Sequence, residues 1–209
     1  SLSSKKLLQL SGITTSSRKM RLLIIKPSSL GDILHVMPSV DLLRQAMPEA
    51  EIDWVVNYDF HDIVAMHAGI RRIIDFPRKN YLTRIFAFFG ELRKQKYDCI
   101  IDYQGLLRSG IIARCAKATM RIGFSDAREG APKFYTDKFL TPSALEHAVD
   151  KNLALTRYVL TKLGLPPKTV ADIHIVPSQE FPCITQETKD AADALLPSDW
   201  QNRDLIGVG

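Results

Sequence analysis

Short apolar runs alternate along the chain with longer stretches in which apolar residues recur at helical spacing. Continuous apolar runs are typical of strands buried on both faces of a parallel sheet, and helical spacing indicates an amphipathic helix. The expected strands are residues 21–26, 51–57, 72–76, 97–103 and 120–124, and the expected helices between them are residues 32–47, 61–68, 81–92 and 105–116. This alternation predicts an α/β fold, a Rossmann-like doubly wound parallel sheet with helices on both faces.

Proline, glycine and charged residues interrupt this pattern. Pro38 falls inside the first helical stretch, where it is expected to kink the helix or remove one hydrogen bond. Residues 125–142 are rich in charge, glycine and proline and are expected to form a loop. Residues 144–164 then predict a long helix with Gly164 at its C-terminal cap.

The pattern divides the chain into three expected parts. A leader, tag or extension occupies residues 1–19, and a Rossmann-like domain occupies residues 20–165. The remainder, residues 166–209, is expected to be a linker followed by the start of a second domain. It contains one predicted helix near residues 187–196 and the first half of a strand at residues 205–209.

Composition and charge restrict the classes of protein. Hydrophobic residues make up 45% and charged residues 24% of the chain, values typical of an ordinary globular protein. No apolar run is long enough to span a membrane, and the basic start of the chain is too polar for a secretory signal. The net charge of +5 favours anionic partners. Cys99 and Cys115 lie in apolar surroundings and are expected to be buried, reduced thiols of a cytoplasmic protein.

The turn after the first expected strand, within "IIKPSSLGDILHVMP", carries the strongest candidate site. Ligands of open parallel sheets bind outside the carboxyl ends of the strands, where this turn lies. Ser28 and Ser29 offer hydroxyl and backbone N–H groups, and Gly31 permits close approach of a ligand or a positive φ. The helix that follows directs its N-terminal N–H groups toward the same edge, and Asp32 lies in its first turn.

Asp32 has two interpretations from residue type alone. An aspartate in a first helical turn is most often a capping carboxylate, which is the structural interpretation. The helix terminus should also keep its pKa low, so that the carboxylate is ionised at neutral pH and able to take a proton from a hydroxyl group. Such a group is a weak base, but a well-placed one.

Five motifs in order resemble those of the lipopolysaccharide heptosyltransferases, which are GT-B glycosyltransferases of family 9. They are K-x-S-S-L-G-D-I-L-H-x-x-P, "IDWVV", "YDCIIDYQGLLRSG", "RIGFSDAREG" and "HAVDKNLAL". The resemblance implies an acceptor-binding domain at residues 20–165 and a nucleotide-sugar-binding domain after it. It also implies inverting transfer of heptose from ADP-heptose to the inner core of lipopolysaccharide, with Asp32 as the general base and with neither a metal nor a cofactor.

Other polar residues follow the expected strands at the same edge. Arg78 and Lys79 follow the third strand, Gln104 follows the fourth, and Arg128 follows the fifth. The family's acceptor is anionic, and arginine can bind carboxylates and phosphates through two parallel hydrogen bonds. These four residues, with Ser28, Ser29 and Gly31, are therefore expected to bind the acceptor.

Structural roles remain open for several of these polar residues. Arg128 could instead hold its own loop by pairing with Asp126 or Glu129. His35 and His147 are expected to have packing or structural roles. The aromatic and basic residues of the helix at 81–92 and beyond form either a solvated face or a contact with the inner membrane surface.

Three other functions compete with sugar transfer. A dinucleotide-binding domain is disfavoured because no GxGxxG follows the first strand. A module that binds an anionic glycolipid without catalysis is the main alternative. A nucleic-acid binder is the weakest, because the positive charge forms no known motif. If the 209 residues act alone, we expect no transferase activity, because the donor-binding half is implied to lie in a further domain.

Overall fold

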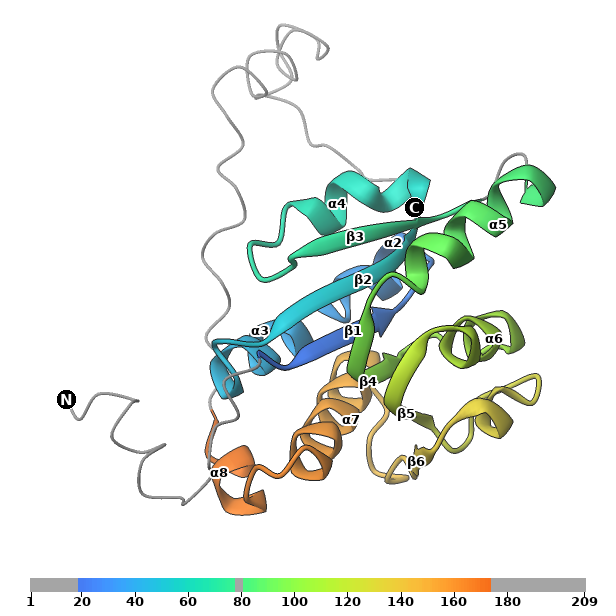
Figure 1. Ribbon diagram of the computed structural model, residues 1–209. Coiled ribbons are helices and arrows are strands. Elements are labelled where there is room, and N and C mark those ends of the chain that lie inside the picture. Colours follow the sequence, from blue (N-terminus) through green and yellow to red (C-terminus); the bar gives the residue numbers. More distant parts are fainter. Residues whose placement is uncertain (1–18, 78–80, 174–209) are drawn as a thin grey trace, which may run out of the picture.

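The computed structural model describes residues 19–77 and 81–173 and shows a single six-stranded sheet with helices on both faces (Figure 1). The strands lie in the order β3-β2-β1-β4-β5-β6, and every neighbouring pair is parallel. The predicted Rossmann-like doubly wound parallel fold is therefore confirmed. The strands are β1 (Arg21–Ile25), β2 (Glu51–Asn57), β3 (Arg72–Phe76), β4 (Lys96–Asp102), β5 (Lys117–Phe124) and β6 (Asp137–Phe139).

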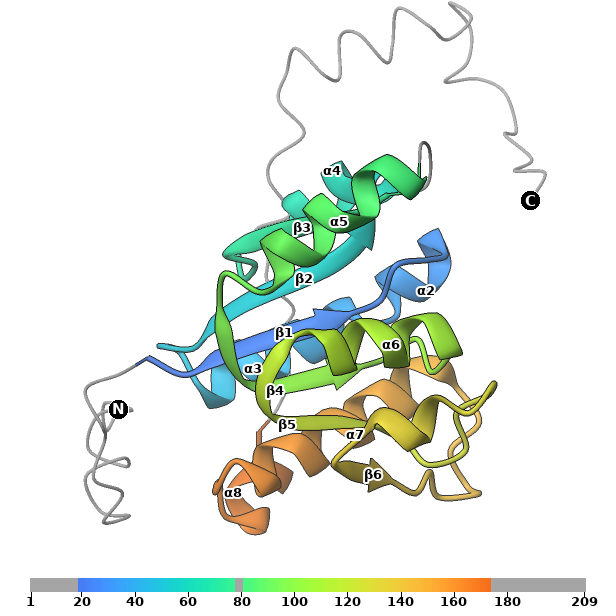
Figure 2. The ribbon, with the colours of Figure 1, turned by 45° about the vertical axis from the view of Figure 1, so that its right-hand side comes forward.

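The helices form two layers that cover opposite faces of the sheet (Figure 2). One layer contains α2 (Leu30–Leu34), α3 (Met37–Ala46), α4 (His61–Ala65), α7 (Ala148–Lys162) and α8 (Pro167–Ala171). The other contains α5 (Tyr81–Leu92) and α6 (Leu107–Cys115). Two short 3₁₀ helices, η1 (Tyr58–Phe60) and η2 (Ala131–Phe134), lie in the connections.

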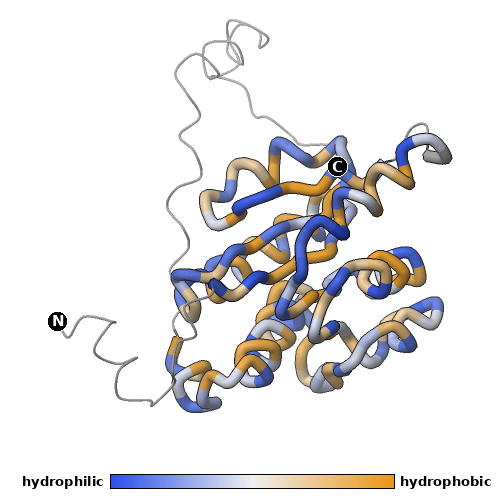
Figure 3. The backbone as a smooth tube through the Cα atoms, viewed as in Figure 1, coloured by the Kyte–Doolittle hydropathy of each residue, from blue (hydrophilic) through white to orange (hydrophobic). Residues whose placement is uncertain are grey.

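The central strand β1 shows how the sequence builds both layers. Its side chains alternate, so that Leu22 and Ile24 pack under the α3 and α7 layer while Leu23 and Ile25 pack under the α5 and α6 layer. All four side chains are fully buried. Hydrophobic positions accordingly concentrate along the central strands and on the helix sides that face them (Figure 3).

Two expectations for the connections are corrected. Residues 125–142 were expected to be a loop, but they contain η2 and the edge strand β6, which pairs with β5. The strand is only three residues long and carries Asp137 and Lys138, so it has no apolar run. The single helix expected at residues 32–47 is in fact two helices, α2 and α3, and Pro38 lies in the first turn of α3, where its missing N–H costs no hydrogen bond.

Helices α4, α6 and α7 match their expected positions with shifted ends, and α5 spans the expected residues 81–92. Helix α8 was not expected, because residues from 166 onward were expected to begin as a linker; Pro167 lies in its first turn. The long helix α7 begins at Ala148, after the His147 cap, rather than at residue 144, and Gly164 follows its end with a φ of 99°. Cys99 is buried as expected, whereas Cys115 is only partly buried. Residues 1–18 of the expected leader, tag or extension (1–19), the helix expected near residues 187–196 and the strand expected at residues 205–209 fall outside the described residues.

No helix within residues 19–77 and 81–173 combines the length and the apolar character that a membrane crossing requires.

Candidate functional site

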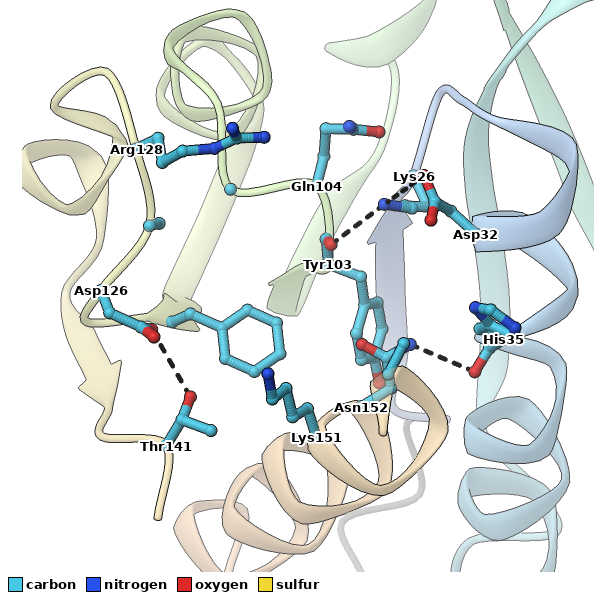
Figure 4. Close-up of a pocket in the computed structure, with 14 residues that line it drawn as sticks. Lys26, Asp32, His35, Tyr103, Gln104, Asp126, Arg128, Thr141, Lys151 and Asn152 are labelled. Atoms are coloured by element: carbon cyan, nitrogen blue, oxygen red, sulfur yellow. Dashed lines mark hydrogen bonds and ion pairs between the residues drawn. The ribbon is translucent and has the colours of Figure 1, made fainter. Parts of the chain in front are cut away.

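A cavity of about 320 Å³ lies at the carboxyl ends of β1, β4 and β5, closed on one side by the start of α7 (Figure 4). The connection from β1 leads to the α3 layer, and that from β4 leads to the α6 layer. Neighbouring strands whose connections leave to opposite faces form the switch point at which open parallel sheets bind ligands. The cavity is lined by residues from the ends of these strands and the nearby loops, from α2 and from α7: Lys26, Asp32, His35, Tyr103, Gln104, Gly105, Phe124, Asp126, Ala127, Arg128, Thr141, Ala148, Lys151 and Asn152.

Asp32 reaches this cavity from the first turn of α2. Its Oδ2 atom accepts hydrogen bonds from the backbone N–H and the hydroxyl of Ser29, each at 3.1 Å. The carboxylate is therefore a helix cap, as the structural interpretation held. Its side chain is nevertheless 48% exposed at the cavity, so capping leaves it accessible to a ligand.

Lys26 lies beside Asp32 at the end of β1. Its Nζ atom is 3.6 Å from Asp32 Oδ2 and donates a hydrogen bond of 3.4 Å to the carbonyl of Tyr103. Burial lowers the pKa of Lys26, although the neighbouring Asp32 and Asp102 carboxylates raise it in part. This lysine was part of the sequence motif but was not predicted as a site residue.

The environment of Asp32 keeps its carboxylate ionised. Partial burial would raise its pKa, but the Ser29 hydrogen bonds and the Lys26 ammonium outweigh burial and lower the pKa below its usual value. The low pKa expected from sequence is therefore present, with Lys26 as an additional cause.

The turn after β4 forms the next wall of the cavity and is held by Asp102. This fully buried carboxylate accepts hydrogen bonds from the backbone N–H groups of Gln104 and Gly105 at 2.9 and 3.1 Å and from the Tyr135 hydroxyl at 2.7 Å. Burial raises the pKa of Asp102, and these hydrogen bonds oppose that rise. The side chain of Gln104 accepts from the backbone N–H of Ser28 at 3.4 Å and so joins this turn to the α2 turn.

Gly105 permits close contact between the β4 turn and the β5 loop. Its φ is 65°, and a Cβ atom there would lie 3.1 Å from the Cβ of Ala127. Its carbonyl accepts a hydrogen bond of 2.9 Å from the backbone N–H of Arg128. A residue with a side chain would strain the backbone and push the two segments apart.

Arg128 is exposed and extends from the β5 loop toward Gln104 (Figure 4). Neither of the two loop carboxylates expected to pair with Arg128 contacts it. Asp126 instead accepts a hydrogen bond from the Thr141 hydroxyl at 3.4 Å, and Glu129 accepts one from the backbone N–H of Leu107 at 3.1 Å. Within the described part of the chain, no ion pair or hydrogen bond engages its guanidinium group. Its charge is thus available to an anionic ligand.

The start of α7 supplies two cavity residues that sequence reasoning did not predict. Lys151 points an ammonium group toward the cavity, and Asn152 donates from Nδ2 to the His35 carbonyl at 3.1 Å. His147 caps α7 through its Nδ1 atom, which accepts from the N–H of Val149, in agreement with a structural role. The ring of His35 lies against that of His147 with a centroid distance of 5.7 Å and also lines the cavity.

The structure thus brings most of the predicted site together. Asp32, Gln104 and Arg128 line one cavity, and the Ser28–Ser29 turn contacts two of them. Gly31 is helical and has no positive φ, so only the close-approach interpretation remains for it. Arg78 and Lys79 lie outside the described residues. Among residues 19–77 and 81–173, no group of His, Cys, Asp and Glu side chains could hold a metal ion.

Comparison with known proteins gives consistent matches. Residues 85–197 match the family described as glycosyltransferase family 9 (heptosyltransferase). Lipopolysaccharide heptosyltransferase 1 of Escherichia coli K12 is 32% identical over 187 residues, which cover 83% of this chain and 56% of that protein. The chain therefore spans about half the length of this relative, and the resemblance inferred from the sequence motifs is confirmed.

Two solved structures are also similar. The E. coli heptosyltransferase WaaC with ADP matches at 36% identity and a TM-score of 0.61, over 71% of this chain and 48% of that chain. WaaC with ADP-2-deoxy-2-fluoro heptose matches at 29% identity and a TM-score of 0.64, over 86% of this chain and 56% of that chain.

Proposed function

Because the chain belongs to glycosyltransferase family 9, the heptosyltransferase family, we propose that it forms the acceptor side of an inverting heptosyltransferase. The donor is ADP-heptose, and the acceptor is the anionic inner core of lipopolysaccharide. The observation that carries this proposal is the ionised carboxylate of Asp32 at a cavity that also contains Lys26, Arg128 and Lys151.

The proposed reaction is a single displacement at the anomeric carbon. The acceptor hydroxyl oxygen forms a bond to that carbon while the bond from the carbon to the ADP oxygen breaks, and ADP leaves with the bonding electrons. Asp32 takes the hydroxyl proton as the new bond forms. One displacement inverts the anomeric centre and needs neither a nucleophile of the enzyme nor a metal.

Asp32 can perform this role because its contacts occupy only one of its two oxygens. The backbone N–H and hydroxyl of Ser29 and the ammonium of Lys26 all contact Oδ2. Within the described residues nothing is hydrogen-bonded to Oδ1. A free carboxylate oxygen in a fixed orientation can accept a hydrogen bond from an incoming hydroxyl group. Its lowered pKa makes it a weak base, so its effect depends on placement rather than basicity.

The charged cavity wall supports an anionic acceptor. Arg128 and Lys151 reach the cavity from two different segments, and neither is neutralised by a carboxylate in the described part of the chain. The carboxylates and phosphates of an inner-core saccharide would pair with them, and the Gln104 amide would bind a sugar hydroxyl. Ser28, Ser29 and Gly31 would let the saccharide approach the α2 turn. Arg78 and Lys79 are retained as acceptor-binding residues from the sequence alone.

The donor is assigned from the relatives. The structures of E. coli WaaC contain ADP or an ADP-heptose analogue, which supports a nucleotide-sugar donor for this chain. The predicted boundary at residue 165 leaves donor binding to the part that follows. We also propose that the enzyme is cytoplasmic and binds peripherally to the inner membrane, because the acceptor is anchored in that membrane.

A transfer assay tests the proposal. The complete gene product that contains this chain is incubated with ADP-heptose and a lipopolysaccharide acceptor that lacks heptose. Mass spectrometry should detect one added heptose per acceptor together with released ADP. Acceptor binding without any transfer would instead support a non-catalytic glycolipid-binding module. The 209-residue chain alone should bind acceptor without transfer, and turnover by it would contradict that expectation.

A further inference from the structure

Lys26 is a buried lysine whose backbone is fixed by the neighbouring strand. Its N–H donates to the carbonyl of Val55 at 3.2 Å, and its own carbonyl accepts from the indole N–H of the fully buried Trp54 at 3.1 Å. Only 10% of its side chain is exposed. The ammonium group therefore starts from a rigid point at the end of β1 and has little freedom to leave the cavity wall.

The ammonium has two polar neighbours on the described residues. It donates to the Tyr103 carbonyl at 3.4 Å and lies 3.6 Å from Asp32 Oδ2. A buried charge is costly unless it is paired and hydrogen-bonded, so the Asp32 carboxylate is a main reason that a lysine is tolerated here. Figure 4 shows Lys26 between the β4 turn and Asp32, with both contacts drawn.

We propose that Lys26 is the positioning residue of the candidate base, holding Oδ2 of Asp32 so that Oδ1 is presented to the acceptor hydroxyl. This inference rests on the proposed function, in which Asp32 takes the proton. The Ser29 contacts alone come from the same helix end as Asp32 and fix the carboxylate only relative to α2. Lys26 ties it to the sheet and to the β4 turn, which are the other walls of the cavity.

Several other groups that line the cavity or lie behind its wall can influence the charge of Asp32. On its own helix, His35 follows one turn later, and the β4 turn contributes the buried Asp102 behind Gln104. The β5 loop contributes Asp126 and Arg128, and α7 contributes Lys151. Among these charged groups of the described residues, only Lys26 forms an ion pair with Asp32. Removing the Lys26 ammonium should therefore change the pKa of Asp32 more than removing any of the others.

NMR titration of the Asp32 side-chain carboxyl carbon in the 209-residue chain tests the inference without any assay of transfer. Lys26→Met removes the charge and keeps an unbranched apolar stem in the buried position. The pKa of Asp32 should be higher in this variant than in the wild type, and Lys26→Arg should restore most of the difference. Lys138→Met, at an exposed position on β6, is the matched control and should leave the pKa of Asp32 unchanged. An identical Asp32 pKa in wild type and Lys26→Met would overturn the inference.

A reciprocal titration covers the case in which Lys26→Met fails to fold. Asp32 is half exposed, so Asp32→Asn should leave the fold intact. The pKa of the Lys26 ammonium, followed by its Nζ resonance, should then fall further because its ion-pair partner is gone. A Lys26 pKa that does not change in Asp32→Asn would contradict the pairing.

Turnover by the complete gene product separates positioning from binding. Lys26→Met should lower kcat about 100-fold, as misplacement of a reacting group does, with a much smaller change in the acceptor KM. The acid limb of the pH–rate profile of Lys26→Met should move to higher pH. Lys26→Arg should recover part of the lost kcat. A raised KM with unchanged kcat would make Lys26 an acceptor-binding residue instead and overturn the inference. If the wild type catalyses no transfer, the proposed function fails, while the titrations still decide whether Lys26 positions Asp32.

Discussion

The hydroxyl of Tyr135 donates a hydrogen bond of 2.7 Å to Oδ2 of Asp102, a carboxylate with no exposed surface. Asp102 uses its other oxygen to hold the N–H groups of Gln104 and Gly105, which form a wall of the cavity. A tyrosine that lies outside the cavity therefore fixes the position of a cavity residue through one buried carboxylate.

Tyr135→Phe should destabilise the fold, because it leaves a lone pair of a buried carboxylate without its donor. We expect a loss of roughly 1–3 kcal/mol in the free energy of unfolding. Urea denaturation measures it as a lower midpoint. Tyr58→Phe is the control, since Tyr58 is 67% exposed and its change should have little effect. Equal midpoints for Tyr135→Phe and the wild type would show that the contact contributes nothing.

Gly31→Ala tests whether the glycine in the α2 turn serves the close approach of the acceptor. Gly31 lies in a helix, and a Cβ atom there would have nothing within 4 Å. Alanine should therefore leave the stability unchanged or raise it by roughly 0.5–1 kcal/mol, because glycine weakens a helix. If the acceptor approaches this turn closely, the same change should weaken acceptor binding. Calorimetric titration with acceptor and thermal unfolding test both parts, and unchanged affinity would exclude close approach.

Arg128→Met and Lys151→Met should each weaken acceptor binding, because each removes an unpaired cation from the cavity wall. Loss of one charge-assisted contact predicts a rise of roughly 10- to 100-fold in the acceptor Kd. Lys138→Met serves as the control for a change of net charge at an exposed position. Affinities that decrease equally in all three variants would indicate a general effect of charge rather than a binding site.

The pH dependence of transfer should reflect the lowered pKa of Asp32. Burial opposes this lowering, but the contacts with Ser29 and Lys26 outweigh it, so the base form persists throughout the neutral range. It is lost only as the pH falls through a value below the ordinary aspartate pKa of about 3.9. We expect kcat/KM to be constant on the acid side down to about pH 5 and to fall below about pH 4. An acid limb near pH 6–7 would contradict Asp32 as the group that titrates, because histidine is the side chain that ordinarily changes charge there.

Much of this fold could be predicted because the strands are short segments rich in apolar residues that alternate with helical patterns. The clearest is β1, in which residues 22–25 are apolar and fully buried on both faces of the sheet. Strand β6 could not be found in this way. Asp137 and Lys138 give it no apolar pattern, and it is formed by pairing with β5. The division of residues 32–47 into two helices was anticipated only as a kink or a lost hydrogen bond at Pro38, because helical periodicity continues across the break.

The candidate site was predicted where the signal is local. Gln104 lies just after β4, and Asp32 lies in the first turn of the helix that follows β1, so the carboxyl edge of the parallel sheet brings the two residues together. Lys26 was overlooked because a lysine that ends a strand usually extends into solvent. Lys151 and Asn152 were overlooked because their place at the cavity depends on how α7 packs against α3, which no local pattern encodes.

The role of Asp32 as the base is tested most directly by the turnover of Asp32→Asn in the complete gene product, measured with ADP-heptose and a heptose-free lipopolysaccharide acceptor. The amide can keep the contact with Lys26 but cannot take a proton at neutral pH. We expect kcat to fall at least about 100-fold, as for loss of a general base, while the acceptor Kd changes little. Glu49→Gln, at an exposed position away from the cavity, should retain full activity. Turnover of Asp32→Asn within a few-fold of the wild type would contradict the role of Asp32 as the base.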